Sequence, residues 1–540
     1  MTADDGHEDP PLRCLVTGAT GYIGGRLVPE LLAAGHSVRC LVRSPGKLRD
    51  HPWAGEAGAA RVDVVRGDVT DERSVREAME GMDVAYYLVH ALGTGRGFEE
   101  TDRRAAGIFG ERARAAGIRR IVYLGGLSPS GVPERALSPH LRSRAEVGRV
   151  LLASGVPTAV LRAAVIIGSG SASFEMLRYL TERLPVMVTP GWVRTRIQPI
   201  AVRDVLRLLV GCARLPYDVN RAFDIGGPDV VTYEEMMRRY AAIEGLPRRV
   251  IMPVPLLTPR LSGLWVGLVT PVPGALARPL VGSLRHEVVC AERDVARFVP
   301  DPPEGPVSLD EALRTALQRV RDLDVARPPS APRRAPSDPL PTDPDWAGGS
   351  LYTDHRERVV GATPQALWRV VEGGVGGVGR VGLVGRLGHG GLRGRTGRRN
   401  AAMPRRLRAG DHLDSWRVEE IEPERRLRLR AEMRLPGVAW LELTVDGDGD
   451  GDGDGEPGDL RNLKDDVRDP RAAYRATYRQ RVLFHPHGLA GHAAWWAAAP
   501  FHSAVFGGMA RTVASAAESG TSPSSRTRHT RRIRRTLRTR

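Results

Sequence analysis

Short apolar runs of strand length alternate with amphipathic segments of helical spacing over residues 12–168. The runs predict strands, and the segments between them predict helices. The expected strands are 12–18, 37–43, 61–66, 84–90, 119–126 and 157–168, and the expected helices are 22–34, 74–83, 101–116 and 138–155. Strands that alternate with helices in this way are typical of βαβ units. The pattern therefore predicts an α/β fold built on a doubly wound parallel sheet.

A proline-rich segment marks a change of pattern after the first half of the chain. Before it, Ser308 and Glu311 have the spacing of a capping box and predict a helix over 308–324. The segment itself, RPPSAPRRAPSDPLPTDPD at 327–345, has no apolar periodicity. This composition predicts an extended linker and a domain boundary.

The second half of the chain has the pattern of an α+β domain. Helices are expected from Thr363 onward and over 489–517, and strands over 350–360, 412–421, 425–434, 438–445 and 474–484. This order predicts an antiparallel sheet that wraps around a long C-terminal helix.

Two low-complexity segments interrupt this domain. Residues 373–397 are rich in Gly, Arg and Val and lack clear periodicity, and residues 446–459 are DGDGDGDGDGEPGD. The acidic segment matches a calcium loop poorly, because Asp459 stands where a loop that starts at Asp448 needs glutamate. We therefore expect a flexible hairpin insertion there.

Charge is concentrated at the C-terminus. The chain of 540 residues has a formal net charge of +16, and its last fifteen residues, RTRHTRRIRRTLRTR, contain eight arginines and no acid. We expect a solvated, disordered basic tail over 519–540. Weak contact with anionic lipid at a membrane surface, or with nucleic acid, is the alternative. Nucleic-acid binding is disfavoured because the tail has no aromatic residue to stack on bases.

Several features favour a cytoplasmic protein. The most apolar stretch, 261–284, contains three prolines and Arg278, so no membrane-spanning helix is expected. The N-terminus, MTADDGHEDP, is acidic and polar, unlike a signal peptide, and residues 1–11 are expected to be disordered. The cysteines show neither a CxxC pair nor metal-ligand spacing, which predicts buried free thiols at Cys14, Cys40, Cys212 and Cys290.

The segment LVTGATGYIGG, 15–25, places three glycines three residues apart between an expected strand and helix. Gly18 permits a tight turn, Gly21 the approach of a pyrophosphate, and Gly24 close packing of the helix on the strand. The helix N-terminus offers free N–H groups to phosphates. This context predicts a dinucleotide site, and a tight turn kept only for packing is the alternative. The expected cofactor-binding residues here are Gly18, Thr20, Gly21, Tyr22, Ile23 and Gly24.

The end of the second expected strand indicates which dinucleotide is bound. NAD sites carry an acidic residue there, whereas NADP sites carry arginine for the 2′-phosphate. The sequence CLVRSPGKL has no acid but contains Arg43 and Lys47. It favours NADP(H) over NAD(H), with surface charge on a loop as the alternative. Asp68 and Val69 follow the third strand, where an adenine ring would lie.

Four motifs, TGATGYIG, GDVTD, YLVHALG and RIVYLGGLSP, resemble those of the atypical, extended branch of the short-chain dehydrogenase/reductase superfamily. NmrA-like proteins and NAD(P)H-binding epimerase/reductase-like proteins belong to that branch. QPIAVRDV at 198–205 and FDIGGPDVVTYEEMMRRYAAIEGL at 223–246 resemble its substrate-side segments. The resemblance extends over roughly residues 12–300 and implies a Rossmann fold.

The second half resembles the START or polyketide-cyclase-like (SRPBCC) helix-grip fold, through ERVVGATPQALWRVV and PFHSAVFGGMARTVASAAE. Residues 373–397 depart from it, because an aromatic-rich segment is expected there. The implied organisation is an NAD(P)-binding Rossmann domain over 12–325, with its substrate-side segments from about residue 170, a proline-rich linker over 326–345, and an α+β helix-grip, START-like domain over 346–518.

The usual catalytic pair of the superfamily is a Tyr with a Lys four residues later, after the fifth strand. In the matching segment, SPHLRSRAEVG, His140 and Arg144 occupy these positions, and no lysine lies between Lys47 and Lys464. A neutral His can exchange protons near pH 7, whereas Arg can hold ribose oxygens but stays protonated. The alternative is that His140 has no chemical role and that the site binds cofactor without turnover.

Other polar side chains are expected around this pair. Tyr123, Ser128 and Ser138 could help to orient a carbonyl, and His90, at the end of the fourth strand, should lie near the cofactor. A satisfied strand-end histidine is the alternative for His90.

The resemblance implies an NAD(P)H-dependent reductase that acts on a small apolar carbonyl or quinone-like substrate, with a C-terminal domain that binds an apolar ligand. The alternative is a non-catalytic NADP(H)-sensing or assembly protein, which the missing Tyr/Lys pair favours. No metal site is expected, because the C-terminal histidines lack ligand spacing: His485, His487, His492 and His502. Trp495 and Trp496 are expected to line the core or a cavity.

Overall fold

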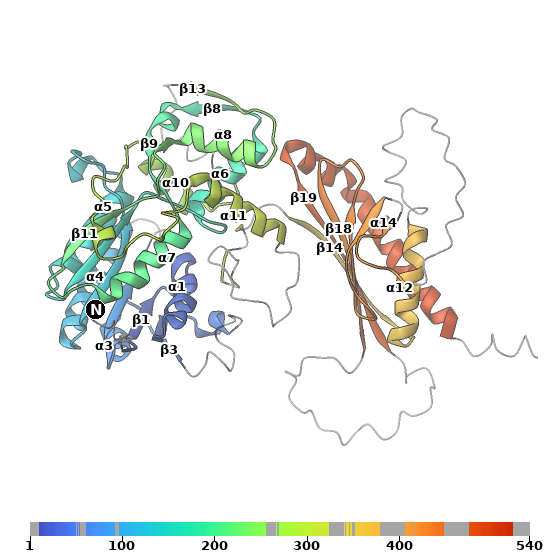
Figure 1. The fold of residues 1–540 in the computed structure, drawn as a ribbon, viewed down its shortest axis with the longest axis horizontal. Coiled ribbons are helices and arrows are strands. Elements are labelled where there is room, and N and C mark those ends of the chain that lie inside the picture. The colour runs from blue at the N-terminus through green and yellow to red at the C-terminus, as the bar shows by residue number, and fades with distance from the viewer. Residues whose placement is uncertain are drawn as a thin grey trace, which may run out of the picture. The chain divides into compact units, whose positions relative to one another are not determined.

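The computed structural model describes residues 10–322 and 340–521, apart from 50, 52, 54–60, 92–96, 255–265, 267, 268, 341, 345, 348–350, 379–405, 414 and 448–474. The chain divides into two compact units, Met1–Gly349 and Ser350–Arg540 (Figure 1). Among the described helices, none combines the length and the apolar character needed to cross a bilayer.

A seven-stranded sheet forms the centre of the N-terminal unit, and every neighbouring pair in it runs parallel. Its order is β11-β6-β5-β4-β1-β2-β3. The strands are β1 Arg13–Thr17, β2 Ser37–Val42, β3 Val62–Arg66, β4 Val84–Tyr87, β5 Arg120–Gly126, β6 Thr158–Ala163 and β11 Arg221–Ile225. The chain builds outward from β1 to β3 and then returns to β4, so the strand order reverses between β1 and β4. This confirms the predicted doubly wound, Rossmann-like sheet.

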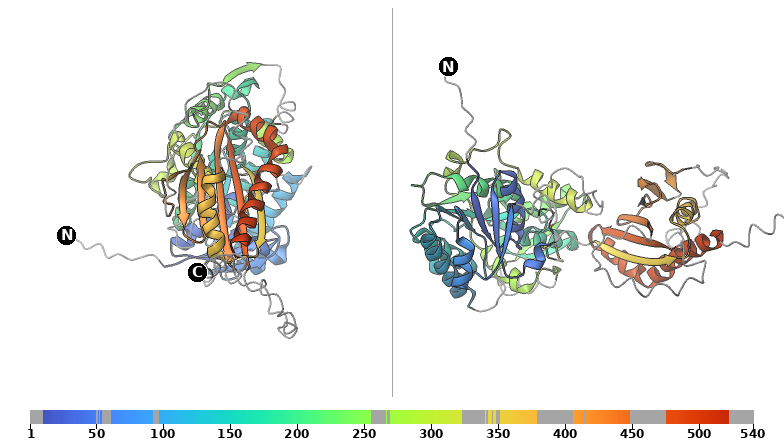
Figure 2. Two further views of the ribbon diagram at one scale, coloured as in Figure 1. Left: turned by 90° about the vertical axis from the view of Figure 1, so that its right-hand side faces the viewer. Right: turned by 90° about the horizontal axis from the view of Figure 1, so that it is seen from below.

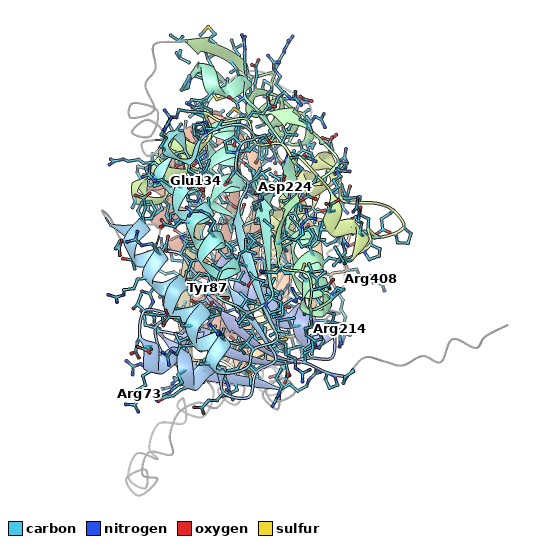
Figure 3. The ribbon with its side chains drawn as sticks, turned by 90° about the vertical axis from the view of Figure 1, so that its left-hand side faces the viewer. Arg73, Tyr87, Glu134, Arg214, Asp224 and Arg408 are labelled. Atoms are coloured by element: carbon cyan, nitrogen blue, oxygen red, sulfur yellow. The ribbon has the colours of Figure 1, made fainter. Side chains whose placement is uncertain are left out.

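Helices cover both faces of this sheet (Figure 2). Because successive side chains of a strand point to opposite faces, each strand contributes to two cores. Val16 packs with α1 (Tyr22–Ala33) and α7 (Val202–Gly211) on one face. Leu15 packs on the other face with α3, α4 and α5, which span Glu72–Met79, Phe98–Ala115 and Pro139–Leu152. Figure 3 shows Tyr87, of this second core, inside the unit and Arg73 at its periphery.

The strand expected over 157–168 is divided in two. Ala164 separates β6 from β7 (Val165–Ile167), which leaves the central sheet and pairs with β10 (Pro199–Ala201). The chain thereby enters the substrate-side region, whose separate core is formed mainly by α6 Ala172–Arg183, α8 Tyr233–Ile243, α10 Gly274–Ser283 and α11 Leu309–Asp322. Two small sheets complete it: β9 Arg196–Ile197 with β12 Val231–Thr232, and β8 Val186–Pro190 with β13 Val250–Val254.

Within the part of this unit that the structure describes, five 3₁₀ turns connect its elements. They are η1 Pro45–Leu48, η3 Glu134–Ala136, η4 Gly191–Arg194, η5 Cys212–Arg214 and η6 Asp294–Arg297. The expected free thiols are confirmed: Cys14, Cys40 and Cys212 are buried, and Cys290 is partly buried. Burial raises the pKa of each of these thiols to about 12, so none is a thiolate at neutral pH.

The last part of the expected linker is packed against the N-terminal unit rather than extended. Backbone bonds from Asp343 N to Leu340 O (2.9 Å) and from Ala347 N to Pro344 O (2.8 Å) close two successive turns. The hydroxyl of Tyr179 donates to the carbonyl of Trp346 at 3.0 Å. The side chains that make contacts in this segment are few and stand between prolines in the sequence, so its overall composition predicts a linker.

The C-terminal unit contains a six-stranded antiparallel sheet in the order β14-β19-β18-β17-β16-β15. The strands are β14 Tyr352–Val360, β15 His412–Leu413, β16 Trp416–Glu422, β17 Arg426–Ala431, β18 Gly437–Gly447 and β19 Ala476–Pro486. Its helices are α12 Pro364–Val378 and α14 Gly488–Thr521. Met509, Ala510 and Val513 of α14 share a core with Leu429 and Leu443 of the sheet.

This arrangement confirms the predicted antiparallel sheet with a long C-terminal helix. The first part of the Gly/Arg/Val-rich segment, Gly373–Val378, is helical, because α12 continues through it. The rest of that segment and most of the acidic segment 446–459 lie outside the described residues.

Candidate functional site

The glycine loop lies at the position where the strand order reverses. Thr17 joins the ends of β1 and β4: its hydroxyl donates to Tyr86 O at 2.9 Å and accepts from Leu88 N at 3.3 Å. Gly18 follows with φ of +75°, and a Cβ atom there would lie 2.8 Å from Leu88 O. Only glycine fits this contact, so the loop after β1 lies directly against the chain after β4, at the point in the strand order where doubly wound folds bind their ligands.

The two later glycines shape the start of α1. Gly21 N donates to Gly18 O at 2.9 Å, and a Cβ atom at Gly24 would lie 2.2 Å from the same oxygen. Gly21 is the N-cap of α1 and makes no side-chain cap hydrogen bond. The N–H groups of Tyr22, Ile23 and Gly24 therefore lack intrahelical partners. With Thr20 in the turn, they form a cradle that fits a pyrophosphate.

The side chain of Tyr22 points away from this cradle into the protein. A Cβ atom at Gly168 would lie 2.3 Å from its hydroxyl oxygen. Burial raises the pKa of Tyr22 well above its ordinary value. Tyr22 can thus offer its backbone N–H to a phosphate, while its ring packs inside the unit.

The residues expected at the adenosine end lie at the carboxyl ends of β2 and β3, on the same edge of the sheet. Arg43 and Lys47 are exposed, and within the described residues neither forms an ion pair. Asp68 Oδ1 accepts from Thr70 N at 2.9 Å and from Thr70 Oγ1 at 2.8 Å. Val69 is partly buried and packs against the core beneath it. Within the described residues, the adenosine end therefore has two exposed cations without an ion pair, Arg43 and Lys47 after β2, and a hydrogen-bonded carboxylate, Asp68, after β3.

His90 lies three residues beyond β4, and the next residue, Ala91, is tied to α5 through a residue that sequence reasoning missed. Asp102, on α4, is 5% exposed. Its Oδ1 accepts from Ala91 N at 2.7 Å, and its Oδ2 accepts from Ser143 Oγ at 2.8 Å. The signal for it was an acidic residue on the otherwise apolar face of the helix expected over 101–116.

His140 lies at the start of α5, and its partner comes from the substrate-side region. Its Nδ1 is 3.2 Å from Oγ of Ser283, the last residue of α10. Ser283 Oγ also lies 2.8 Å from Ser138 Oγ and within 3.0 Å of Pro279 O, to which it can donate. Ser138 is the N-cap of α5 and accepts from Leu141 N at 3.2 Å. No sequence pattern indicated Ser283, because 143 residues separate it from His140.

Arg144 and Tyr123 brace β5 against α5. Arg144 donates to Leu124 O at 2.6 Å, and its guanidinium lies 5.3 Å from the centre of the Tyr123 ring. The Tyr123 hydroxyl donates to Arg144 O at 3.2 Å, and its side chain is fully buried. Tyr123 is thus a core residue, which corrects the expectation that it helps to orient a carbonyl. Ser128 is partly buried two residues beyond β5.

Both histidines of the site are neutral at physiological pH. Burial, the Arg144 cation and His90 together lower the pKa of His140 to about 3. The surrounding protein and Arg144 also lower the pKa of His90, although water reaches its side chain. Because an unfolded histidine binds a proton below about pH 6.5, acidification through that range favours the unfolded chain. At neutral pH each imidazole acts as a hydrogen-bond donor or acceptor, not as a cation.

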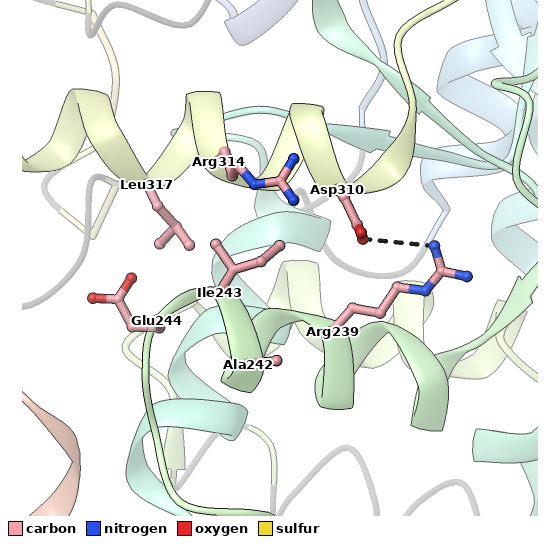
Figure 4. Close-up of a pocket in the computed structure, with 7 residues that line it drawn as sticks. All are labelled: Arg239, Ala242, Ile243, Glu244, Asp310, Arg314 and Leu317. Carbon is pink, nitrogen blue, oxygen red and sulfur yellow. Dashed lines mark ion pairs between the residues drawn. The ribbon is translucent and has the colours of Figure 1, made fainter.

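A separate surface pocket of about 460 Å³ lies between α8 and α11 (Figure 4). Both of its cations already have partners: Arg239 pairs with Glu235 at 2.6 Å, Asp229 at 3.1 Å and Asp310 at 3.6 Å, and Arg314 pairs with Glu311 at 3.6 Å. It contains none of the residues predicted for the site. The region at the ends of β1 and β4 is therefore the stronger candidate, since it combines the uncapped start of α1 with polar side chains.

Comparison with known proteins agrees with this assignment. Residues 18–171 match a family of NAD(P)H-binding proteins. Residues 346–509 match a family described as a protein of unknown function (DUF2867).

Individual relatives cover the first unit. The chain is 30% identical over 255 residues to a ceramide reductase of Caulobacter vibrioides, covering 44% of this chain and 73% of that protein. It is 36% identical over 131 residues to sterol demethylase protein B of Methylococcus capsulatus, covering 23% of this chain but only 38% of the relative. The triphenylmethane reductase of Citrobacter sp., solved with NADP(H), is 19% identical with a TM-score of 0.44, covering 56% of this chain and 99% of the reductase.

Gly24→Ala tests the phosphate cradle. Because the new Cβ atom would meet Gly18 O at 2.2 Å, the turn must open. We expect NADPH affinity to fall by at least about tenfold, measured by nicotinamide fluorescence titration. Gly107→Ala is the matched control, since nothing lies within 4 Å of its added Cβ in α4 and its affinity should stay unchanged. Equal NADPH binding by both variants would show that the loop is not a phosphate site.

Proposed function

The N-terminal unit belongs to the NAD(P)H-binding, atypical branch of the short-chain dehydrogenase/reductase family. From this premise we propose that the protein is an NADPH-dependent reductase that acts on a small apolar carbonyl or quinone-like substrate. The observation that carries the proposal is His140. The sequence resemblance aligns it with the tyrosine of the family, and its neutral imidazole has a hydroxyl partner in Ser283.

The cofactor preference rests on the end of β2. Arg43 and Lys47 offer two cations to a 2′-phosphate, and no acidic residue is present there for a free ribose hydroxyl. We assign the pyrophosphate to the N-terminus of α1, the adenine to Asp68 and Val69, and the neighbourhood of the nicotinamide to His90. The bound cofactor would supply the hydride, and the protein supplies orientation and proton transfer.

The proton arrangement of His140 depends on Ser283. The Ser283 hydroxyl can donate either to Pro279 O or to Nδ1 of His140. When it donates to Nδ1, the proton of the imidazole is on Nε2 and can be donated to a substrate carbonyl. As the carbonyl is reduced, the Nε2 proton passes to the new alcohol oxygen, Nδ1 takes the Ser283 proton, and solvent reprotonates Ser283. The other arrangement leaves Nε2 as an acceptor and suits the reverse reaction.

Arg144 has a positioning role in this scheme. One of its N–H groups is already bound to Leu124 O, and its charge suppresses the imidazolium form of His140. It can keep a positive charge near the nicotinamide ribose, but it cannot shuttle protons as a lysine-assisted tyrosine does.

The second candidate is an NADP(H)-sensing or assembly protein without turnover. The engagement of Arg144 with Leu124 O and the Tyr123 ring favours it, because a structural arginine replaces the catalytic lysine. Both candidates need the phosphate cradle, and only the reductase needs His140.

For the C-terminal unit we propose a helix-grip, START-like fold that holds an apolar ligand. The support is the long α14 packed against an antiparallel sheet, together with an aromatic cluster at one end. The ring of Trp495 stacks 5.1 Å from Tyr352 and 5.7 Å from Phe484. Trp496 is 65% exposed and donates to the Tyr352 hydroxyl at 3.2 Å, so the expectation of a lining residue is wrong for Trp496.

Arg43→Asp tests the cofactor preference. Loss of a charge-assisted hydrogen bond to the 2′-phosphate should weaken NADPH binding by about 10- to 100-fold, with little effect on NADH. Arg104→Asp, on the exposed side of α4, changes the same charge elsewhere and should leave both affinities unchanged. Parallel loss of NADPH and NADH affinity in Arg43→Asp would contradict the assignment.

His140→Ala tests the reductase. With a quinone acceptor such as menadione, kcat should fall by about 100-fold at pH 7 while NADPH affinity stays close to that of the wild type. Because the pKa of His140 is held at about 3, the wild-type rate should show no step across the ordinary histidine range. His412→Ala, at an exposed histidine of the other unit, is the control. Tight NADPH binding without oxidation by any acceptor would favour the sensor.

Trp495→Phe tests the ligand proposal for the C-terminal unit. Binding of menadione near the aromatic cluster should quench tryptophan fluorescence in the wild type, and the substitution should remove most of that quenching. Trp53→Phe changes a buried tryptophan of the N-terminal unit and should retain the quenching. Quenching that is unaffected by Trp495→Phe would place the ligand elsewhere.

A further inference from the structure

The described residues between 340 and 347, namely 340, 342–344, 346 and 347, form what we call the clasp segment, which lies against the helix that begins at the glycine loop. A Cβ atom at Gly25 of α1 would lie 2.9 Å from Leu340 Cδ1. The Thr342 hydroxyl is 3.1 Å from Nε2 of His51, and Trp346 O accepts from Tyr179 of α6. The clasp segment is thus fixed to three separate parts of the N-terminal unit.

The centre of this contact is a buried ion pair between α1 and the clasp segment. Arg26 donates to both carboxylate oxygens of Asp343, at 2.8 Å and 2.6 Å. The two side chains are only 2% and 6% exposed. Asp343 Oδ2 also accepts from Leu340 N at 2.9 Å, which orients the carboxylate within its own turn. Removing one partner of such a pair leaves a buried charge without compensation.

Arg26 connects this pair to the first residue of the phosphate cradle. Its guanidinium lies 4.1 Å from the centre of the Tyr22 ring, and it donates to Tyr22 O at 3.1 Å. It also donates to Ser169 O at 3.4 Å. A Cβ atom at Gly170 would lie 3.3 Å from Asp343 Oδ2, so the carboxylate contacts the chain that lies beside Tyr22. The position of Tyr22, and with it the first turn of α1, depends on where Arg26 is held.

We propose that Asp343 is a positioning residue for the dinucleotide, which completes the cofactor loop from 317 residues away by holding Arg26 and thereby Tyr22. The inference rests on the proposal that this loop binds NADPH. Without the carboxylate, Arg26 would turn toward the remaining carbonyl acceptors at Tyr22 and Ser169. The N–H groups of the first turn would then lose their alignment toward the pyrophosphate.

Asp343→Asn in the full chain tests this role. We expect NADPH affinity to fall by about 10-fold or more, because small misplacements of binding groups have effects of this size. Exchange of the charges, Arg26→Asp with Asp343→Arg, should recover part of the affinity. Leu340→Ala loosens the clasp segment without leaving a buried charge and should weaken NADPH binding to a smaller extent.

The matched control breaks another buried ion pair of the same unit. Arg178 and Glu182 of α6 pair at 3.1 Å and are 0% and 3% exposed. Glu182→Gln should lower the thermal midpoint, as Asp343→Asn does, but it should leave NADPH affinity unchanged.

The outcomes separate the two proposals. Wild-type protein that fails to bind NADPH would overturn the proposed function and this inference together. Wild-type binding with unchanged affinity in both Asp343→Asn and Leu340→Ala would overturn only the positioning role. Weaker binding in these two variants, recovered by the charge exchange and absent from Glu182→Gln, would establish it.

Discussion

The approach of Gly18 to the carbonyl of Leu88 is the constraint on which the rest of the N-terminal unit depends. It fixes the end of β1 against the end of β4, where the strand order reverses. Because that contact admits no side chain, the loop turns sharply, and α1 starts directly after it at Tyr22. His90 follows in the chain that leaves β4 beside this loop. The parallel sheet holds the ends of β1 and β4 in place, and the absence of a Cβ atom at Gly18 lets the loop between β1 and α1 pack against them.

The chemistry around His140 can be understood from charge. In the family the proton donor is assisted by lysine, whereas this chain has no lysine between Lys47 and Lys464. An arginine in its place cannot give up a proton, but it does repel a second positive charge. Burial, with the repulsion from Arg144 added to it, lowers the pKa of the imidazole, so His140 is neutral at physiological pH and can exchange hydrogen bonds with Ser283. In the proposed reductase, the tautomer of a neutral His140, which depends on the hydrogen bond to Ser283, would take the place of an acid whose pKa is tuned by lysine.

The sequence predicted the structural features that neighbouring residues determine, and it missed the residues whose roles depend on contacts between distant parts of the chain. The period of apolar residues located the strands of the parallel sheet, and the glycine spacing located the turn, since both are local properties. The pair of His140 and Arg144 followed from the resemblance, which aligns them with the tyrosine and lysine of the superfamily. Ser283, Asp102 and Asp343 did not emerge, because each acts through a contact with a residue far away in the sequence. Tyr123 was expected to help orient a carbonyl, but its ring packs in the core. When both faces of a strand are buried, the alternation of residues does not tell which side chains reach a functional site.

The clasp segment also affects where recombination can separate the two units of this chain. Proline-rich segments are the usual places where domains are joined, separated or exchanged, because few contacts cross them. Here the last residues of such a segment supply a carboxylate to the first helix of the chain. A recombination break within that segment would leave Arg26 with its carbonyl acceptors at Tyr22 and Ser169 but without its buried counter-charge. Exchange of the C-terminal unit should therefore disturb the N-terminal unit least when the junction lies beyond Ala347.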